Sequence, residues 1–440
     1  MDVLLHKAPP LTGALTVPPD KAICQRAILV AALADGVTTI RPWPDADDCA
    51  RARELVRGLG AAVEASGDGI RVAGRGRAGL RAPAGPLDCG ESGTTLRLAA
   101  GLLAGCPFTA TLAAGPSLSR RPMRRIVEPL TQMGAAIDGV PAPSGDEILP
   151  PLRIRGRSPL RAIRYVLLVP SAQVKSALLL AALAADGPTT VVEPSPTRDH
   201  TERLLRRCGV RVQGGRELRL EPGPVRAPGE LRPPGDISSA AFFVAAACCV
   251  PGSEVTLQDV GLNPARTGAL AVLRRMGADI ATDVEDDGWE PRGRVTVRAR
   301  PLSAVRIEAA EAPGLIDELP LLMVAAACAR GTTQLFGLGE LRVKETDRLR
   351  SMTGGLAALG VRIRPAGPDA IEIEGGAITG GRADSSGDHR TAMSLAIAGL
   401  VAERPTTVTG AECVAKSYPG FFTRLAALAG SSTVKSVDKA

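Results

Sequence analysis

Residues 342–348 place cations and carboxylates at a spacing that suits acid–base chemistry on an anion. They read Arg-Val-Lys-Glu-Thr-Asp-Arg and lie between a strand-like stretch and a helical pattern over 349–359. If the helix begins near Lys344, then Lys344, Glu345 and Arg348 share one face of it. Such a helix start could bind an anionic group and supply one proton-transfer group. Taken alone, a solvated, salt-bridged first turn is the simpler interpretation.

The composition favours a small anionic ligand over a nucleic acid. The chain has 440 residues, enough for two domains with separate cores, and a net charge of +7. Aromatic residues make up only 2% of it, which leaves few rings to stack on bases. The surplus of Arg and Lys therefore suits a small acidic or phosphorylated substrate, and we expect no nucleic-acid partner.

The cysteines and the lack of a long apolar run predict a cytoplasmic protein. The chain has nine cysteines, an odd number, without a Cys-x-x-Cys motif, which predicts reduced thiols and no zinc site. The first residues show no signal-peptide pattern. No apolar run approaches the ~18 residues that span a bilayer. We therefore expect no membrane partner.

A unit of two helices and short strands recurs six times. In the first copy an Ala-rich helix over 21–35 precedes a strand at 36–40 and a second helix over 47–59, which ends at a C-capping glycine, Gly60. The Ser- and Lys-rich residues 430–440, after the last copy, are expected to be loosely ordered. Each copy reads βαβαβ(β), and copies of roughly 65 to 80 residues are too long for an ordinary solenoid, so we predict two three-fold assemblies. The later copies open at Glu91, Ser171, Asp236, Asp317 and Asp388.

Two proline pairs mark where the chain passes between the two assemblies. Pro18-Pro19 and Pro233-Pro234 bracket the first three copies, and a proline pair forms a stiff, extended segment. We therefore expect one domain from residues 1–19 with 234–440 and a second from 20–233. The active site is expected in the cleft between them.

Polar residues gather at the start of the first helix in every copy. Each of them, taken singly, is explained as an N-cap, which is the better interpretation for Asp236. Six helix N-termini directed at one cleft would, however, surround an anion with positive dipole ends. The surplus of cations over carboxylates near these starts predicts a site for two anionic substrates. These cations are Lys21, Arg26, Arg97, Arg121, Lys344, Arg348, Arg390 and Lys416.

A series of motifs runs along essentially the whole chain. Three of them read Asp-Lys-Ala-Ile-Cys-Gln-Arg at 20–26, Gly-Thr-Thr-Leu-Arg at 93–97 and Ser-Ala-Gln-Val-Lys-Ser at 171–176. Together the motifs resemble those of the 5-enolpyruvylshikimate-3-phosphate (EPSP) synthase family of enolpyruvyl transferases. The resemblance implies an α/β (α+β) fold, a two-domain inside-out α/β barrel of six βαβαββ repeats, three per domain. The other motifs lie at 121–123, 198–202, 235–239, 262–264, 315–320, 342–348 and 387–390.

The resemblance also implies a reaction. The enolpyruvyl group of phosphoenolpyruvate (PEP) is transferred to the 5-hydroxyl of shikimate 3-phosphate, and phosphate is released by addition and then elimination through a tetrahedral ketal. One group must deprotonate the hydroxyl while another protonates the methylene carbon. By the resemblance, Asp317 is the base on the hydroxyl, and Glu345 with Lys21 handles the methylene proton.

The binding residues follow from the same motifs. The resemblance implies that PEP is bound by Lys21, Gly93, Arg121, Gln173, Arg348, Arg390 and Lys416. It implies that the phosphorylated acceptor is bound by Lys21, Ala22, Arg26, Ser171, Ala172, Gln173, Arg198, Asp317 and Lys344. No metal or organic cofactor is implied, the partners are these two small molecules, and the protein is expected to be a monomer.

The chain departs from the family's pattern at three positions. Ala22 stands where the family usually has Ser, and Pro116 where Asp is common. Glu91 replaces the usual Asn beside the expected PEP pocket. A carboxylate there would repel PEP unless it is neutral or paired, and Arg97 and Arg120 are the candidate partners.

These departures leave three functions open. The first is EPSP synthase itself, with Ala22 and Glu91 as tolerated divergence. The second is a paralogue that transfers enolpyruvate to another phosphorylated alcohol, such as a nucleoside monophosphate. The third is an inactive homologue that serves as a scaffold, which the retention of Lys21, Asp317 and Glu345 disfavours.

Overall fold

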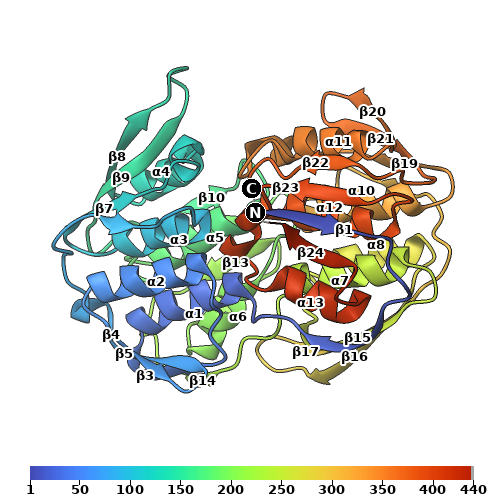
Figure 1. The fold of residues 1–440 in the computed structure, drawn as a ribbon. Helices are drawn as coiled ribbons and strands as arrows, with labels where there is room; N and C mark the ends of the chain where they lie inside the picture. Colours follow the sequence, from blue (N-terminus) through green and yellow to red (C-terminus); the bar gives the residue numbers. More distant parts are fainter. Residues whose placement is uncertain (438–440) are drawn as a thin grey trace. The chain divides into compact units, whose positions relative to one another are not determined.

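The chain forms two compact units in a computed structural model that describes residues 1–437 (Figure 1). Unit 1 comprises Met1–Pro18 with Pro234–Ala440, and unit 2 comprises Pro19–Pro233. The boundaries fall inside the two proline pairs, where each ring fixes φ and removes a backbone donor, so the chain leaves one unit in an extended conformation. No helix within residues 1–437 is long and apolar enough to cross a bilayer.

The three four-stranded sheets of unit 2 share one topology. Their orders are β14-β3-β5-β4, β6-β7-β9-β8 and β10-β11-β13-β12. In each sheet the first pair of strands is parallel and the next two pairs are antiparallel. The strands are β3 (Asp35–Ile40), β4 (Ala62–Ser66), β5 (Gly69–Arg75), β6 (Leu87–Asp88), β7 (Thr109–Ala113), β8 (Ala136–Pro141), β9 (Ile148–Arg155), β10 (Arg164–Val166), β11 (Thr189–Val192), β12 (Val212–Gln213), β13 (Glu217–Leu220) and β14 (Gly229–Leu231).

Unit 1 repeats this topology in the sheets β2-β15-β17-β16, β18-β19-β21-β20 and β22-β23-β1-β24. The parallel pair again comes first in each. Six sheets in two sets of three confirm the α/β class and the six predicted repeats. The strands are β1 (Asp2–Leu5), β2 (Thr12–Thr16), β15 (Glu254–Gly261), β16 (Asp279–Asp286), β17 (Arg292–Arg298), β18 (Arg306–Ile307), β19 (Thr332–Leu335), β20 (Arg362–Gly367), β21 (Ala370–Glu374), β22 (Arg382–Asp384), β23 (Thr406–Thr409) and β24 (Val434–Val437).

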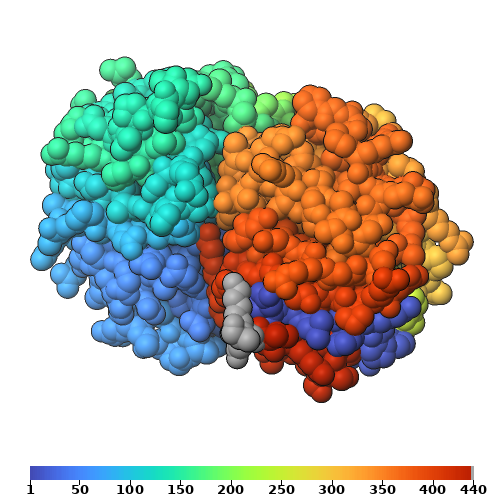
Figure 2. All heavy atoms as spheres, turned by 45° about the horizontal axis from the view of Figure 1, so that its top comes forward, coloured from blue at the N-terminus to red at the C-terminus, as the bar shows by residue number. Residues whose placement is uncertain are grey.

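The sixth sheet is completed by both ends of the chain. β1 lies between β23 and β24 and pairs antiparallel with each. The blue N-terminal residues accordingly emerge among the orange and red C-terminal ones (Figure 2). The expectation of a loosely ordered tail is wrong for 434–437, because these residues pair with β1, and residues 438–440 lie outside the described chain.

The first helix of each repeat forms the core of its unit. These helices are buried on nearly all sides, as the Ala- and Leu-rich sequences require, since a helix that is apolar all round must be covered all round. In unit 1 they pack on one another. In unit 2 the closest approach is at Gly101, where an added Cβ would lie 2.1 Å from the carbonyl oxygen of Ala177. These core helices are α1 (Lys21–Leu33), α3 (Gly93–Ala104), α5 (Ala172–Ala182), α7 (Ile237–Cys249), α10 (Leu319–Cys328) and α12 (His389–Val401).

The second helix of each repeat has one buried face and one exposed face. These helices are α2 (Asp47–Gly58), α4 (Arg124–Gln132), α6 (His200–Arg207), α8 (Gly268–Arg275), α11 (Arg348–Ala358) and α13 (Phe421–Ala429). Short helical turns fill some connections, and they are η1 (Arg77–Gly79), η2 (Leu118–Arg120), α9 (Ala312–Leu315), η3 (Gly339–Val343) and η4 (Ala411–Lys416).

Candidate active site

Side-chain caps fix where five of the six core helices begin. An oxygen of each capping side chain accepts a hydrogen bond from a backbone N–H in the first turn, which satisfies a donor that the helix itself leaves open. The caps are Asp20 for α1, Ser92 for α3, Ser171 for α5, Asp236 for α7 and Asp388 for α12. The capping role predicted for Asp236 is confirmed.

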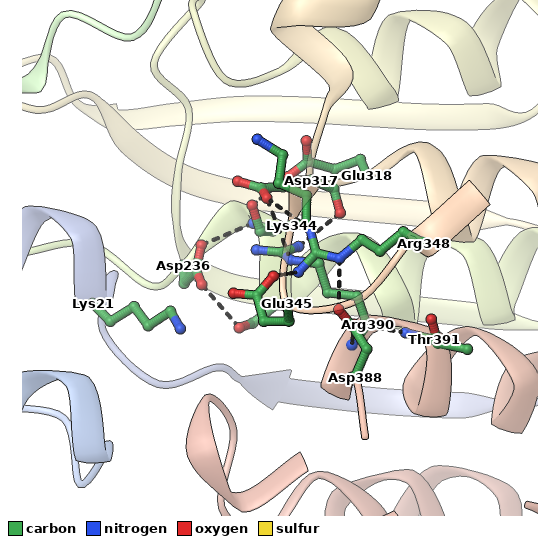
Figure 3. A network of polar contacts seen from close by, with 12 residues as sticks. Lys21, Asp236, Asp317, Glu318, Lys344, Glu345, Arg348, Asp388, Arg390 and Thr391 are labelled. Carbon is green, nitrogen blue, oxygen red and sulfur yellow. Dashed lines mark hydrogen bonds and ion pairs between the residues drawn. The ribbon is translucent and has the colours of Figure 1, made fainter. Parts of the chain in front are cut away.

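In unit 1 the predicted residues meet around the guanidinium of Arg348 (Figure 3). Arg348 is only 1% exposed and begins α11. Its Nε donates to Asp388 Oδ2 at 2.8 Å, its Nη2 donates to Glu345 Oε2, and its Nη1 lies 3.5 Å from Asp317 Oδ1. One cation therefore holds three carboxylates that come from three separate segments of unit 1.

These carboxylates determine the charge state of Arg348. Burial alone would lower the pKa of its guanidinium, but Asp388, Glu345 and Asp317 together outweigh burial and raise that pKa. The guanidinium is thus a permanent cation, and removing it would take away the cation paired with Asp388, whose side chain is fully buried.

Asp317 lies against a second guanidinium. Arg390 donates from Nη1 to the Asp317 carbonyl oxygen at 2.7 Å, and its Nε lies 3.5 Å from Asp317 Oδ1. The Asp317 side chain is 20% exposed, whereas that of Arg390 is 8% exposed. A partly accessible carboxylate between two buried cations is well placed to accept a proton from a bound ligand and to keep its own orientation meanwhile.

Lys344 also lies near Asp317, but it does not belong to a helix as predicted. The helix does not begin near Lys344: η3 ends at Val343, and α11 starts at Arg348, because Asp347 caps it by accepting from Arg350 N at 3.0 Å. Lys344 and Arg348 therefore do not share a helix face. The pKa of the Lys344 ammonium is lowered to about 8, because burial outweighs the nearby carboxylates, Asp317 foremost.

Three of the predicted PEP-binding residues of unit 2 lie around Arg97. Arg97 donates from Nη1 to Gln173 Oε1 at 2.6 Å, and Gln173 donates from Nε2 to Thr94 Oγ1 at 2.9 Å. A Cβ added to Gly93 would lie 2.9 Å from Arg97 Nη1 and 3.5 Å from Arg121 Nη1. Gly93, Arg121 and Gln173 are thus brought together, and the small residue leaves space beside two guanidinium groups.

Arg26, one of the predicted acceptor-binding residues, is held by several hydrogen bonds in unit 2. Arg26 is 4% exposed and donates to Thr201 Oγ1 at 3.0 Å, to Ser176 Oγ at 3.2 Å and to the Ala22 carbonyl oxygen at 2.9 Å. These bonds tie α1 to α5 and α6. Ser171 and Ala172 form the start of α5, so two of the predicted acceptor-binding residues belong to one capped helix end, which suits an anion.

Lys21, the first residue of α1, is held by a carboxylate that the sequence prediction did not include. Its Nζ lies 2.7 Å from Asp48 Oδ2, and the two side chains are 17% and 9% exposed. Asp48 is the second residue of α2, the helix predicted over 47–59. A pair of this kind orients the ammonium.

Two predicted residues lie outside these groups. Arg198 lies in the loop between β11 and α6 and is half-buried. Lys416 ends η4 and is half-buried as well.

Comparison with known proteins decides the family. The family model for EPSP synthase (3-phosphoshikimate 1-carboxyvinyltransferase) matches residues 5–425. The chain is 49% identical over 415 residues to the 3-phosphoshikimate 1-carboxyvinyltransferase of Alkalilimnicola ehrlichii, covering 93% of this chain and 92% of the relative. It is 46% identical over 429 residues to that of Shouchella clausii, covering 97% and 98%.

The solved structures agree. The EPSP synthase of Acinetobacter baumannii superposes with a TM-score of 0.86 at 40% identity, covering 99% of each chain. The chain belongs to the EPSP synthase family. It is therefore an enzyme of the transferase class, and its fold is that of its relatives.

Glu91, where the EPSP synthase pattern usually has Asn, does not have either of the arginine partners considered for it. Its Oε2 accepts from Leu118 N at 2.7 Å and its Oε1 accepts from Ser117 N at 3.1 Å. The carboxylate is thus bonded to the backbone at the start of η2. No sequence signal pointed to this, because the partners lie 26 and 27 residues along the chain.

Other members of the site were also missed by the sequence prediction. Asp388 was recognised as a helix start but not as a partner of Arg348, which lies 40 residues away. Thr201 and Ser176 lie inside the quoted motifs, and their contacts with Arg26 follow only from the packing of α1, α5 and α6. Within residues 1–437, no group of three or more His, Cys, Asp or Glu side chains is arranged to hold a metal ion.

Proposed function

We propose that this protein transfers the enolpyruvyl group of PEP to the 5-hydroxyl of shikimate 3-phosphate and releases phosphate. Membership of the EPSP synthase family supports the reaction. The observation that carries the assignment of residues is that Asp317 and Glu345 both contact the guanidinium of Arg348. Two carboxylates oriented by one cation can serve two separate proton transfers in one reaction.

In the first half of the reaction Asp317 takes the proton of the acceptor hydroxyl. The hydroxyl oxygen forms a bond to C2 of PEP, and C3 receives a proton from Glu345 or Lys21, which gives a tetrahedral ketal. In the second half the roles reverse: Glu345 or Lys21 takes a proton back from the new methyl group, and Asp317 gives its proton to the leaving phosphate. The bond between C2 and the phosphate oxygen breaks, and the C2–C3 double bond is restored. Phosphate leaves, and atoms and charge balance over the two steps.

The cations divide between the two substrates. We assign the PEP carboxylate to Arg348 and Arg390, whose forked guanidinium groups suit bidentate contacts. We assign the PEP phosphate to Arg121, Gln173 and Lys416 and the amides near Gly93. We assign the acceptor phosphate to Ser171, Ala172, Arg198 and Lys344. We assign the acceptor carboxylate to Arg26. The acceptor site also includes Lys21, Ala22 and Gln173.

Phosphate release from PEP tests this function. Purified protein is given PEP with shikimate 3-phosphate, with a nucleoside monophosphate, or with no acceptor. We expect rapid phosphate release only with shikimate 3-phosphate, and loss of that release in Asp317→Asn. Release only with the nucleoside monophosphate would instead assign the protein to another acceptor, and no release with either would support a non-catalytic role.

We further propose that the protein acts in the cytoplasm as a monomer. No disulfide links the nine cysteines of the described chain, which suits a reducing compartment. Gel filtration with light scattering measures the mass, and the mass of one chain, 45.3 kDa, is the expected result.

A further inference from the structure

The segment that carries Arg121 is held at both ends by carboxylates that bond to its backbone. It connects β7 to α4 and contains η2. At its beginning, Glu91 accepts from the amides of Ser117 and Leu118, with Oε2 of Glu91 at 2.7 Å from Leu118 N. At its end, Glu147 Oε1 accepts from Arg124 N at 2.7 Å and from Met123 N at 3.2 Å.

The loops around Glu91 leave space for its carboxylate and supply backbone donors to it. Gly115 N donates to the Gly90 carbonyl oxygen at 2.7 Å, which brings the two loops together. A Cβ added to Gly115 would lie 2.5 Å from Glu91 Oε1, so a larger residue at position 115 would displace the carboxylate. The short helix η2 begins where Glu91 bonds, and amide donors at a helix start favour a negative acceptor.

Glu147 makes a different kind of contact. It lies just before β9, and its Oε1 alone accepts from Met123, Arg124 and, at 2.8 Å, its own neighbour Ile148. Met123 is fully buried and its amide also donates to the Ile148 carbonyl oxygen at 2.8 Å. The start of α4 is thereby fixed to the edge of the β8–β9 hairpin.

Arg121 lies between these two attachments. Its side chain is 8% exposed, and Nη2 donates to Ser117 Oγ at 3.3 Å, so the guanidinium is tied to the residue that Glu91 holds. We propose that Glu91 and Glu147 are positioning residues, which fix the backbone on both sides of Arg121 and so set its guanidinium for the PEP phosphate. This inference rests on the proposed function for its ligand. It also explains how an acid can stand beside an anion site, because its charge is bonded to backbone amides.

Glutamine substitutions separate this role from a purely electrostatic one. Both oxygens of Glu91 accept from backbone N–H groups, so Glu91→Gln must turn an NH₂ toward one of them and lose that bond. Glu147 uses one oxygen for its contacts, so Glu147→Gln can keep them all, whereas Glu147→Ala cannot. Asp186→Asn is the matched control, since Asp186 Oδ1 accepts from Ala162 N at 2.8 Å on another loop of unit 2.

We expect Glu91→Gln and Glu147→Ala to raise KM for PEP by about tenfold each, the size typical of a lost hydrogen bond to a charged group. Glu147→Gln and Asp186→Asn should stay near wild type, and KM for shikimate 3-phosphate should change little in any variant. In Arg121→Ala protein, Glu91→Gln should add almost nothing, because the guanidinium it positions is absent. A decrease of KM for PEP in Glu91→Gln would overturn the proposal, because the carboxylate would then act by repelling PEP.

Hydrogen exchange gives a readout that does not depend on turnover. The amides of Ser117 and Leu118 should exchange faster in Glu91→Gln, and those of Met123 and Arg124 faster in Glu147→Ala. Unchanged exchange in both variants would overturn the proposal. If wild-type protein releases no phosphate but the exchange rates change as expected, the proposed function fails while the two attachments stand.

Discussion

The two units share one topology but use charge differently. In unit 1 the buried guanidinium of Arg348 contacts three carboxylates, Asp317, Glu345 and Asp388. In unit 2 the contacts of Arg97 and Arg26 described above are to amide, hydroxyl and carbonyl oxygens, those of Gln173, Thr201 and Ser176 among them. The chemical groups available in each unit are therefore determined by individual side chains and not by the fold that the two units share.

The difference has a physical consequence for what each unit can do. A cation that is bonded to neutral oxygens keeps its positive charge available to an anion, and the hydroxyl and amide groups hold it in place at little electrostatic cost. A cation that is already neutralised by carboxylates gives up that surplus, but it orients groups that can exchange protons. We therefore expect the guanidinium groups of Arg97 and Arg26 to serve mainly in binding anions, and the carboxylates around Arg348 to serve mainly in proton transfer.

The largest effect should come from removing one acid–base group of unit 1. Asp317→Asn keeps the shape and one oxygen but cannot take a proton, so kcat should fall by about 10²- to 10⁴-fold, the usual contribution of a general base. Circular dichroism and phosphate release measure fold and rate. Glu340→Gln is the control, since Glu340 is a partly exposed acid of the same unit, 3.9 Å from Lys344 Nζ. A rate near wild type in Asp317→Asn would remove the acid–base role from unit 1.

The second effect concerns stability. Arg348→Met should destabilise unit 1 by about 3–5 kcal/mol, because the fully buried carboxylate of Asp388 loses the guanidinium with which it is paired. Arg97→Met should cost unit 2 less, about 1–3 kcal/mol, because it breaks hydrogen bonds to uncharged oxygens. Urea unfolding monitored by circular dichroism measures both. Equal losses in the two variants would show that the two units do not differ in the way that the contacts indicate.

The third effect tests the space beside the cations of unit 2. Gly93→Ala places a methyl group 2.9 Å from Arg97 Nη1 and should displace that guanidinium, which can move because it ends a flexible side chain. We expect KM for PEP to rise roughly tenfold, about 1.4 kcal/mol of binding, with a smaller change for the acceptor. Gly223→Ala, where a Cβ meets nothing within 4 Å, is the control and should behave as wild type. An unchanged KM for PEP in Gly93→Ala would mean that PEP does not use this space.

The smallest effect concerns Lys344, the cation of unit 1 that is assigned to the acceptor phosphate. The pKa of Lys344 is lowered to about 8, so its charge is present below pH 8 and is lost as the pH rises through that value. With that pKa, kcat/KM for shikimate 3-phosphate should fall roughly fourfold between pH 7 and about pH 8.5. Lys344→Arg stays charged and should show no such fall. A profile that is the same in both proteins would assign the titration to another group.

Much of the fold could be predicted from the sequence because its signals are local. Three signals recur at regular intervals: Ala-rich helical patterns, a glycine after each second helix, and a polar residue before each core helix. Each signal lies within a few residues of the element that it predicts. The caps Asp20, Ser92 and Ser171 indeed begin their helices. The same regularity predicted six repeats and an α/β class.

What the sequence left undecided depends on residues that are far apart along the chain. β1 completes the sheet of the sixth repeat through pairs such as Val3 with Val408, so the tail at 434–437 is a strand instead of a loose end. Local pattern also misplaced the start of α11, because residues 344–346 look helical while the cap at Asp347 stops the helix from extending backwards. A cap is decided by where a side chain can reach an open N–H, and that depends on the folded backbone.

The sequence by itself determined the family, the repeats and the types of group available for chemistry. Only the tertiary structure decided which of these groups touch, as in Arg348 with Asp388, Lys21 with Asp48 and Glu91 with the backbone of η2. The physical reason is that secondary structure follows from neighbours in sequence, whereas the partner of a buried charge is whichever group the packing of distant elements brings within hydrogen-bond distance.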